Sequence, residues 1–190
     1  SGSYLVEVSR GCPQRCRFCS VSYTEASTRF RRLSFLKSAF DEGVEKVGRV
    51  GLVGAALADH PELVEMADYI VAKRGQISLS SLRVEAVSGK LMDLLVHSTQ
   101  RTLTLALETG SVRLQTVIKK RTSEEKVFSC IETALKSGIR NLKFYFIIGL
   151  PTEIREDIHE LASLVKRLHA HFLKISKSLG RIGNCLLYTS

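Results

Sequence analysis

The sequence predicts an α/β fold in which a parallel sheet of about five strands forms an open or partial barrel with helices outside. Two observations lead to this prediction. Short strand-like runs alternate along the chain with longer segments whose apolar residues recur at helical spacing. The length of 190 residues, with 44% apolar residues, suits one domain with a substantial core. Because strand and helix alternate, we expect right-handed crossovers and parallel strands.

The first half of the chain is expected to hold three strands and three helices. The strands are placed at residues 4–9, 49–54 and 77–85. The first of them alternates apolar and polar residues, as a half-buried strand does. The helices are placed where apolar residues recur three and four positions apart, at residues 34–47, 60–73 and 89–97. Asp59 and Glu62 are expected to cap the second helix, and residues 21–33 to form a loop across the mouth of the barrel.

The second half continues the same alternation. Strands are expected at residues 102–108 and 141–150. Helices are expected at residues 111–119, 123–136 and 153–172. Three leucines form one face of the strand at 102–108, so Glu108 on the opposite face would project into the top of the barrel. Cys130 falls on the apolar face of its helix and is interpreted as a core residue.

No sixth strand is evident after the last helix. The final residues, 185–190, read Cys-Leu-Leu-Tyr-Thr-Ser and resemble translated sequencing-adapter read-through, as found at the ends of assembled environmental genes. We therefore expect residues 1–184 to form one domain, residues 185–190 not to be native, and the native protein to be longer on both sides. A genomic read that continues unchanged through residues 186–190 would contradict this expectation.

Three cysteines in eight residues form the chemical centre of the sequence. Cys12, Cys16 and Cys19 have the spacing C-x-x-x-C-x-x-C on a loop that follows the first strand, so they lie at the ligand-binding end of a parallel sheet. Thiolates so close together can converge on a soft metal centre. A structural zinc site requires four ligands, whereas three cysteines can hold a [4Fe-4S] cluster and leave its fourth iron without a protein ligand. A disulfide and a zinc site with a remote fourth ligand are the alternatives.

The cysteine loop resembles the signature of the radical S-adenosylmethionine (SAM) superfamily, C-x-x-x-C-x-aromatic-C, with Phe18 as the aromatic residue. The resemblance covers about residues 4–172. It implies a partial (βα)6 barrel, here truncated to about five strands, in which the three cysteines bind a [4Fe-4S] cluster and SAM chelates the open iron. It further implies an enzyme that cleaves SAM reductively to a 5'-deoxyadenosyl radical.

The resemblance also implies residues that bind SAM. Gly54 and Ala55 stand where related proteins carry a G-G-E-like stretch that receives the amino group of SAM. The acidic residue is absent here, but the small side chains let the backbone approach a ligand. Glu108 begins a stretch resembling an E-S-G-S or E-T-G-S motif near the SAM ribose. Ile148 and Gly149 belong to a stretch resembling a G-L-P motif, and would border the adenine.

Arg83 is a further residue with an implied role. An alternation of two would place Ser81, Arg83 and Glu85 on one face of the third predicted strand, at the SAM site. An arginine there needs a partner or a solvated position. The resemblance implies that Arg83 binds the SAM carboxylate, a bidentate contact suited to a guanidinium. An internal ion pair with Glu85, Glu7 or Glu108 is the alternative.

The charge balance bears on partners. The net charge is +9, with basic clusters at residues 29–32 and 119–121, yet basic and aromatic residues do not interleave as in RNA-binding segments, so nucleic acid contact is possible but not favoured. No apolar run approaches the roughly 18 residues of a membrane span, so no membrane contact is expected. A reducing, cytoplasmic setting suits the cysteines. The implied chemistry needs an external one-electron reductant of the flavodoxin or ferredoxin type, and the substrate is unknown.

Three functions remain in consideration. The Arg-Gly-Cys-Pro entry to the loop, the E-T-G-S stretch and the G-L-P stretch together resemble radical SAM proteins in which a cobalamin-binding domain precedes the barrel. Cobalamin, held by a domain absent from this chain, is therefore a possible further cofactor. One alternative is a non-catalytic iron–sulfur or zinc module that carries electrons or scaffolds a partner. The other is an RNA-modifying enzyme of the methylthiotransferase kind.

Overall fold

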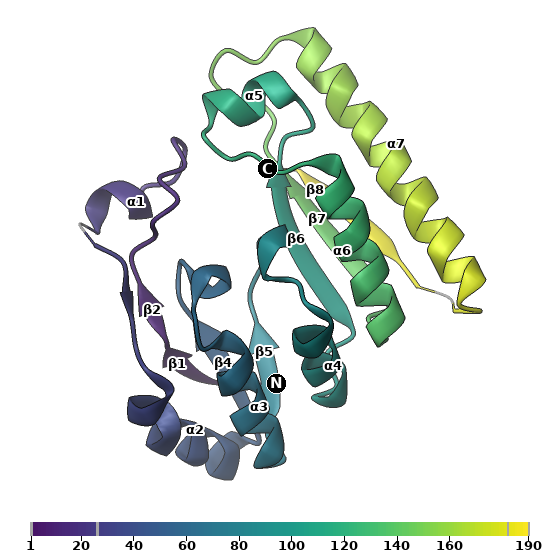
Figure 1. Ribbon diagram of the computed structural model, residues 1–190. Helices are drawn as coiled ribbons and strands as arrows, with labels where there is room; N and C mark the ends of the chain where they lie inside the picture. The colour runs from purple at the N-terminus through teal and green to yellow at the C-terminus, as the bar shows by residue number, and fades with distance from the viewer. Residues whose placement is uncertain (1, 26, 182, 190) are drawn as a thin grey trace.

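The computed structural model describes residues 2–25, 27–181 and 183–189, and consists of parallel strands with helices packed around them (Figure 1). The parallel strands follow one another in chain order: β1 (Tyr4–Glu7), β4 (Arg49–Val53), β5 (Gln76–Leu79), β6 (Thr102–Glu108), β7 (Asn141–Phe146) and β8 (Cys185–Thr189). They form two three-stranded sheets, β1-β4-β5 and β6-β7-β8. This architecture confirms the predicted α/β fold with parallel strands.

The two sheets are joined at one point. Leu82 forms an isolated parallel bridge with Leu105 of β6, and the amide of Leu82 donates to the carbonyl of Thr104 at 2.9 Å. Both leucines are buried, with 1% and 0% of their surface exposed. The join therefore continues the curved sheet from β5 to β6 and keeps the carboxyl ends of all the parallel strands at one edge.

Long helices alternate with the strands and supply the outer layer of the core (Figure 1). They are α2 (Leu33–Val47), α3 (Leu63–Ala72), α4 (Gly89–His97), α6 (Glu124–Ser137) and α7 (Arg155–Ser178). Their apolar faces share one core with the leucine face of β6, as predicted, and with Phe144 and Phe146 of β7. Cys130 lies in that core, 4% exposed, as its position in the helix predicted. No helix in the described part of the chain has the length and apolarity needed to cross a membrane.

Short elements gather at the carboxyl ends of the strands. They are β2 (Ser9–Arg10), α1 (Val21–Thr24), β3 (Arg29–Phe30), η1 (Leu57–Asp59), η2 (Val84–Ala86) and α5 (Val112–Val117). β2 and β3 form an antiparallel pair, so the segment predicted as a plain loop, residues 21–33, contains a helical turn and a strand. The pairing was missed because two-residue strands leave no periodic pattern.

The prediction that no sixth strand follows the last helix is wrong. Cys185–Thr189 forms β8, which pairs in parallel with β7 from Leu142 to Phe146. A five-residue strand at the edge of a sheet carries little pattern of its own, and its register comes from its neighbour. The barrel is therefore partial, as predicted, but has six parallel strands rather than about five. The native or non-native origin of residues 185–190 stays a prediction, and Ser190 lies outside the described residues.

Two further local predictions are corrected. The third strand ends at Leu79 rather than continuing to Glu85, because its pairing with β4 stops there, Leu82 forms an isolated bridge to β6, and η2 begins at Val84. Asp59 and Glu62 do not form a capping pair. The Glu62 carboxylate instead accepts a hydrogen bond from the amide of Leu33 at 2.8 Å, and thereby fixes the start of α2.

His60 ties these short elements together and makes stability depend on pH. It is 5% exposed, its Nδ1 accepts a hydrogen bond from the Glu62 amide at 3.0 Å, and its Nε2 donates to the Arg31 carbonyl at 3.1 Å. The ring also packs edge-on against Phe30, with centroids 5.1 Å apart. Burial lowers the pKa of His60 below its ordinary value of 6.5.

We predict that this histidine costs stability in acid. Since its pKa is lower in the folded protein, its contribution is fully present above pH 6.5 and is lost as the pH falls through the folded pKa. Thermal unfolding of the wild type and His60→Gln at pH 7.5 and 5.5 measures this effect. Between pH 7.5 and pH 5.5, the melting temperature of the wild type should fall by more than that of the variant. An equal loss in both proteins would contradict the assignment.

Candidate functional site

The cysteine loop leaves β2 at the carboxyl end of the sheet. Cys16 is buried, with 8% of its surface exposed, and Cys12 and Cys19 are half-buried. All three thiols are free, which removes the disulfide alternative from the described structure. The amide of Cys19 donates to the carbonyl of Cys16 at 3.1 Å and closes a turn between the second and third cysteines.

Two contacts fix the loop across the end of the sheet. On one side, the side-chain amide of Gln14 donates to Asp59 of η1 at 2.8 Å. On the other, the backbone amide of Arg17 donates to the carbonyl of Ile118, and its guanidinium donates to the carbonyl of Val117, both at 2.9 Å. The last carbonyls of a helix lack intrahelical partners and favour a cation, so the end of α5 is a suitable anchor for Arg17.

Several charged groups lie near Cys16 and shift the pKa of its thiol. Burial raises the pKa of the Cys16 thiol, while the cations Lys120 and Arg83 act in the opposite direction. Cys12 and Cys19 raise it further when they carry charge. All of these groups therefore lie within electrostatic reach of the second cysteine, and the two cations favour its thiolate form.

The donor set fits an iron–sulfur cluster better than a single ion. Within residues 2–25, 27–181 and 183–189, no group of three or more His, Cys, Asp or Glu side chains converges closely enough to hold one metal ion. A zinc ion requires its sulfur ligands at about 2.3 Å. In a cluster each thiolate binds its own iron, so three free thiols on one loop need not converge on a point.

Gly54 and Ala55 line a pocket beneath the loop. Its volume is 410 Å³, and it is bounded by the ends of β1, β2, β4 and β5 together with α1. Pockets of about 300–1,000 Å³ hold small ligands and cofactors. A β-carbon at position 54 would lie 2.1 Å from the Ser9 hydroxyl oxygen, so Gly54 also allows a close approach inside the protein, and its predicted contact with SAM stays a prediction. The close approach is therefore between two strands of the protein.

Arg83 and Ser81 lie on an irregular segment instead of a strand. The Arg83 Nε is 3.4 Å from a carboxylate oxygen of Glu85, so the structure contains one of the ion pairs considered as an alternative. Ser81 is exposed and does not line the pocket, to which Ser80 contributes instead. Arg83 nevertheless lies near enough to Cys16 for its charge to lower the pKa of that thiol.

Glu108 forms a buried ion pair that the sequence did not predict. Its carboxylate accepts a hydrogen bond from Lys120 at 2.7 Å, and the two side chains are 11% and 9% exposed. Glu108 has a φ of 70°, and the amide of Thr109 donates to the carbonyl of Leu107 at 2.9 Å across it. This is a γ-turn with positive φ, a rare and strained conformation. The turn ends β6 and directs the carboxylate toward Lys120, under the cysteine loop.

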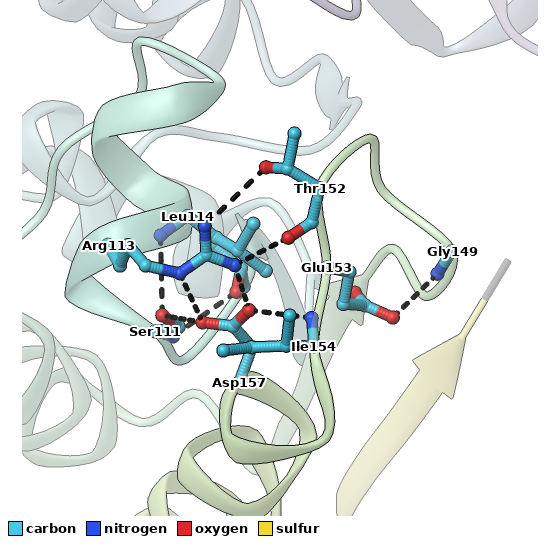
Figure 2. Close-up of polar contacts among 9 residues, drawn as sticks. Ser111, Arg113, Leu114, Gly149, Thr152, Glu153, Ile154 and Asp157 are labelled. Carbon is cyan, nitrogen blue, oxygen red and sulfur yellow. Dashed lines mark hydrogen bonds and ion pairs between the residues drawn. The ribbon is translucent and has the colours of Figure 1, made fainter.

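Ser111, the last residue of the Glu-Thr-Gly-Ser stretch, links the start of α5 to α7 through Asp157 (Figure 2). Ser111 caps α5 by accepting a hydrogen bond from the amide of Leu114, and donates to buried Asp157 at 2.5 Å. Arg113 also binds Asp157, and this contact is the chief reason that the pKa of Asp157 falls to about 2. Gly110 packs against the backbone of α7. These contacts therefore hold α5 and the stretch before it against α7.

Apolar side chains at the same end remain accessible. Phe18 is 41% exposed and Ile148 is 49% exposed. Gly149 has a φ of 85°, which favours glycine, and its amide donates to Glu153 at 2.9 Å (Figure 2). β7 ends at Phe146, so Ile148 and Gly149 lie in the following turn rather than in the strand. Their predicted contact with adenine stays a prediction.

We predict that Gly110→Ala destabilises the fold. An added β-carbon would lie 2.6 Å from the Cα of Leu161 in α7, so the helix must move. Overpacking of this kind costs about 1–3 kcal/mol. Gly89→Ala is the matched control, because nothing lies within 4 Å of a β-carbon there. Chemical denaturation should show a loss for the first variant only, and equal stabilities would contradict the close packing.

The fold and the cysteine loop define a protein that binds a cofactor at the carboxyl ends of a partial parallel barrel. The Radical SAM superfamily matches residues 6–165, which is most of the chain. The chain therefore belongs to the radical SAM superfamily, and the prediction of a radical SAM enzyme is confirmed at the level of the family.

Individual relatives and structures agree with this assignment. An uncharacterised protein of Methanocaldococcus jannaschii is 38% identical over 93% of this chain and 40% of its own length. A tRNA-2-methylthio-N(6)-dimethylallyladenosine synthase of Chromohalobacter salexigens is 26% identical over 86% of this chain and 40% of its own length. The structure of the radical S-adenosylmethionine methyltransferase TsrM from Kitasatospora setae, with cobalamin and a [4Fe-4S] cluster bound, has a TM-score of 0.74 at 13% identity. The match covers 88% of this chain and 35% of the TsrM chain. The chain thus spans less than half the length of these proteins.

Proposed function

We propose that this chain is the core of an enzyme that binds a [4Fe-4S] cluster through Cys12, Cys16 and Cys19 and cleaves SAM reductively to a 5'-deoxyadenosyl radical. When bound to the three cysteines, the cluster would supply the electron for the cleavage of SAM. The radical then modifies a substrate held in the barrel. A cytoplasmic location suits such oxygen-sensitive chemistry.

One observation carries the proposal. Three free thiols lie on a loop that is fixed over the carboxyl ends of parallel strands, beside a pocket of 410 Å³. Cofactor sites of parallel α/β folds are found at this end. Membership of the radical SAM superfamily supports the same conclusion.

The residues around the pocket have distinct roles in this proposal. The backbone at Gly54 and Ala55 faces the SAM amino group, and Arg83 exchanges its contact with Glu85 for the SAM carboxylate. That exchange is plausible physically because the Arg83–Glu85 contact, at 3.4 Å, is long for an ion pair and its carboxylate is 38% exposed. Ser81, on the same segment, lies at the edge of this contact.

The cysteine loop and the second half of the barrel supply the nucleoside contacts. Phe18, Ile148 and Gly149 offer exposed apolar surface and backbone groups for the adenine. Glu108 accepts hydrogen bonds from the ribose hydroxyls with the carboxylate capacity that Lys120 leaves unused. Lys120 holds that carboxylate in place and keeps positive charge near the cysteines.

Other components lie outside this chain. The electron comes from an external one-electron reductant of the flavodoxin or ferredoxin type. Cobalamin, held by a separate domain, is supported by the similarity to the cobalamin-bound methyltransferase structure. The substrate is not identified by these residues.

Anaerobic reconstitution tests the proposal. The wild type should contain about four irons and four sulfides per chain, and should release 5'-deoxyadenosine with SAM and dithionite. Cys16→Ser should lower both the iron content and the product to background, because one of three ligands is lost. Cys130→Ala is the control, since that thiol lies in the helix core, and it should retain the cluster at some cost in stability. A full cluster that neither cleaves SAM nor changes its spectrum with SAM would instead favour the non-catalytic module.

A methylthiotransferase-like enzyme acting on RNA is the second candidate. It is favoured by one observation, the similarity to a tRNA-2-methylthio-N(6)-dimethylallyladenosine synthase over 86% of this chain. Transfer of a methylthio group to RNA by the complete protein would establish it. SAM cleavage without such transfer would leave the general proposal in place and exclude this candidate.

A further inference from the structure

Three arginines lie close together on the antiparallel pair of β2 and β3, which we call the hairpin and which flanks the cysteine loop. Arg10 lies directly opposite Arg29 in the antiparallel register. Arg31 follows two residues after Arg29, and its amide continues the pairing by donating to the carbonyl of Val8 at 2.9 Å. Residues two apart in an extended chain project to the same side. Together with Glu7, the three arginines line a hollow of 310 Å³.

Cations outnumber the anions around this hollow. The Glu7 carboxylate accepts two hydrogen bonds from Arg10, at 2.9 and 2.8 Å, and lies 3.7 Å from Arg31. Glu25 accepts one hydrogen bond from Arg29 at 3.2 Å. Like charges directly opposite each other destabilise a strand pair, so an arrangement with three guanidiniums and two carboxylates favours a further anion. The three hydrogen bonds use only part of the donors that three guanidiniums offer.

We propose that Arg10, Arg29 and Arg31 form a binding site for a phosphate group, carried either by a small phosphate monoester or by the phosphodiester backbone of a nucleic acid. Guanidinium groups match phosphate oxygens in pairs and remain charged at every relevant pH. The arginine side chains are 54–63% exposed, so a ligand can reach them without a rearrangement of the fold.

The arginine site is suited to bind a phosphate group and not a nucleobase. Phe30, between Arg29 and Arg31, turns to the other side of the strand and packs on His60, so it offers no platform inside the hollow. The hollow shares Glu7 and Arg10 with the 410 Å³ pocket beside the cysteine loop. A phosphate held here would therefore anchor a substrate at the mouth of the barrel. That last role rests on the proposed function, whereas phosphate binding itself does not.

Binding measurements on the reconstituted protein without SAM test the site. The probes are inorganic phosphate, uridine monophosphate and a single-stranded RNA decamer, each at one fixed, low salt concentration. Arg31→Gln should weaken binding about tenfold, because it removes one charged donor. Arg29→Gln is a second variant with the same expectation, and Arg31→Lys, which keeps the charge, should lose less. Thermal unfolding checks that each variant is folded.

The control is Arg140→Gln, the same chemical change at an exposed residue before β7, at the opposite end of the strands. Weakening by the hairpin variants alone, with the small phosphates as probes, supports a monoester site. Weakening seen only with the decamer supports a phosphodiester site. The proposal is overturned if no probe binds, or if Arg140→Gln weakens binding as much as the hairpin variants do. Iron and sulfide content of the same samples reports separately on the proposed function.

Discussion

The geometry of the site depends on how two three-stranded sheets are held side by side. The pocket at Gly54 belongs to the half formed by β1, β4 and β5, whereas Glu108 and Ile148 belong to the half formed by β6, β7 and β8. The sheets share one backbone bridge, at Leu82 and Leu105. The cysteine loop provides a second connection, because Gln14 contacts η1 after β4 and Arg17 contacts the end of α5 after β6. The loop thus both carries the thiols and links the two halves of the barrel.

Charge around the thiols is arranged to oppose the effect of burial. A buried thiol resists ionisation, and neighbouring thiolates add to that resistance. Lys120 and Arg83 counteract both effects at Cys16. Lys120 is itself buried, which is tolerable because Glu108 lies 2.7 Å away. The strained γ-turn at Glu108 positions this carboxylate to bind Lys120. The irregular end of β6 therefore helps to keep a positive charge near the thiols of the cysteine loop.

The sequence predicted what periodicity and local spacing determine, and missed what long-range contacts determine. The helix at 89–97 and the strand at 102–108 were placed within their observed bounds, because apolar spacing marks both. β8 was missed because an edge strand takes its register from a neighbour. Arg83 was placed on a strand because alternation continued past Leu79, where the pairing with β4 ends. The buried pair of Glu108 and Lys120 was missed because nothing in the local sequence pattern marks Lys120 as the partner of Glu108.

The single bridge between the sheets also affects how easily the two sheets separate locally. Neighbouring strands within each half share several register pairs, whereas among the described residues the two sheets share one isolated bridge, at Leu82 and Leu105. A ligand that binds only the closed arrangement stabilises it by mass action. Cofactors held between the cysteine loop and both halves would therefore suppress separation of the sheets. Hydrogen exchange at the Leu82 amide would slow accordingly, so this one backbone group can report whether the barrel is loaded.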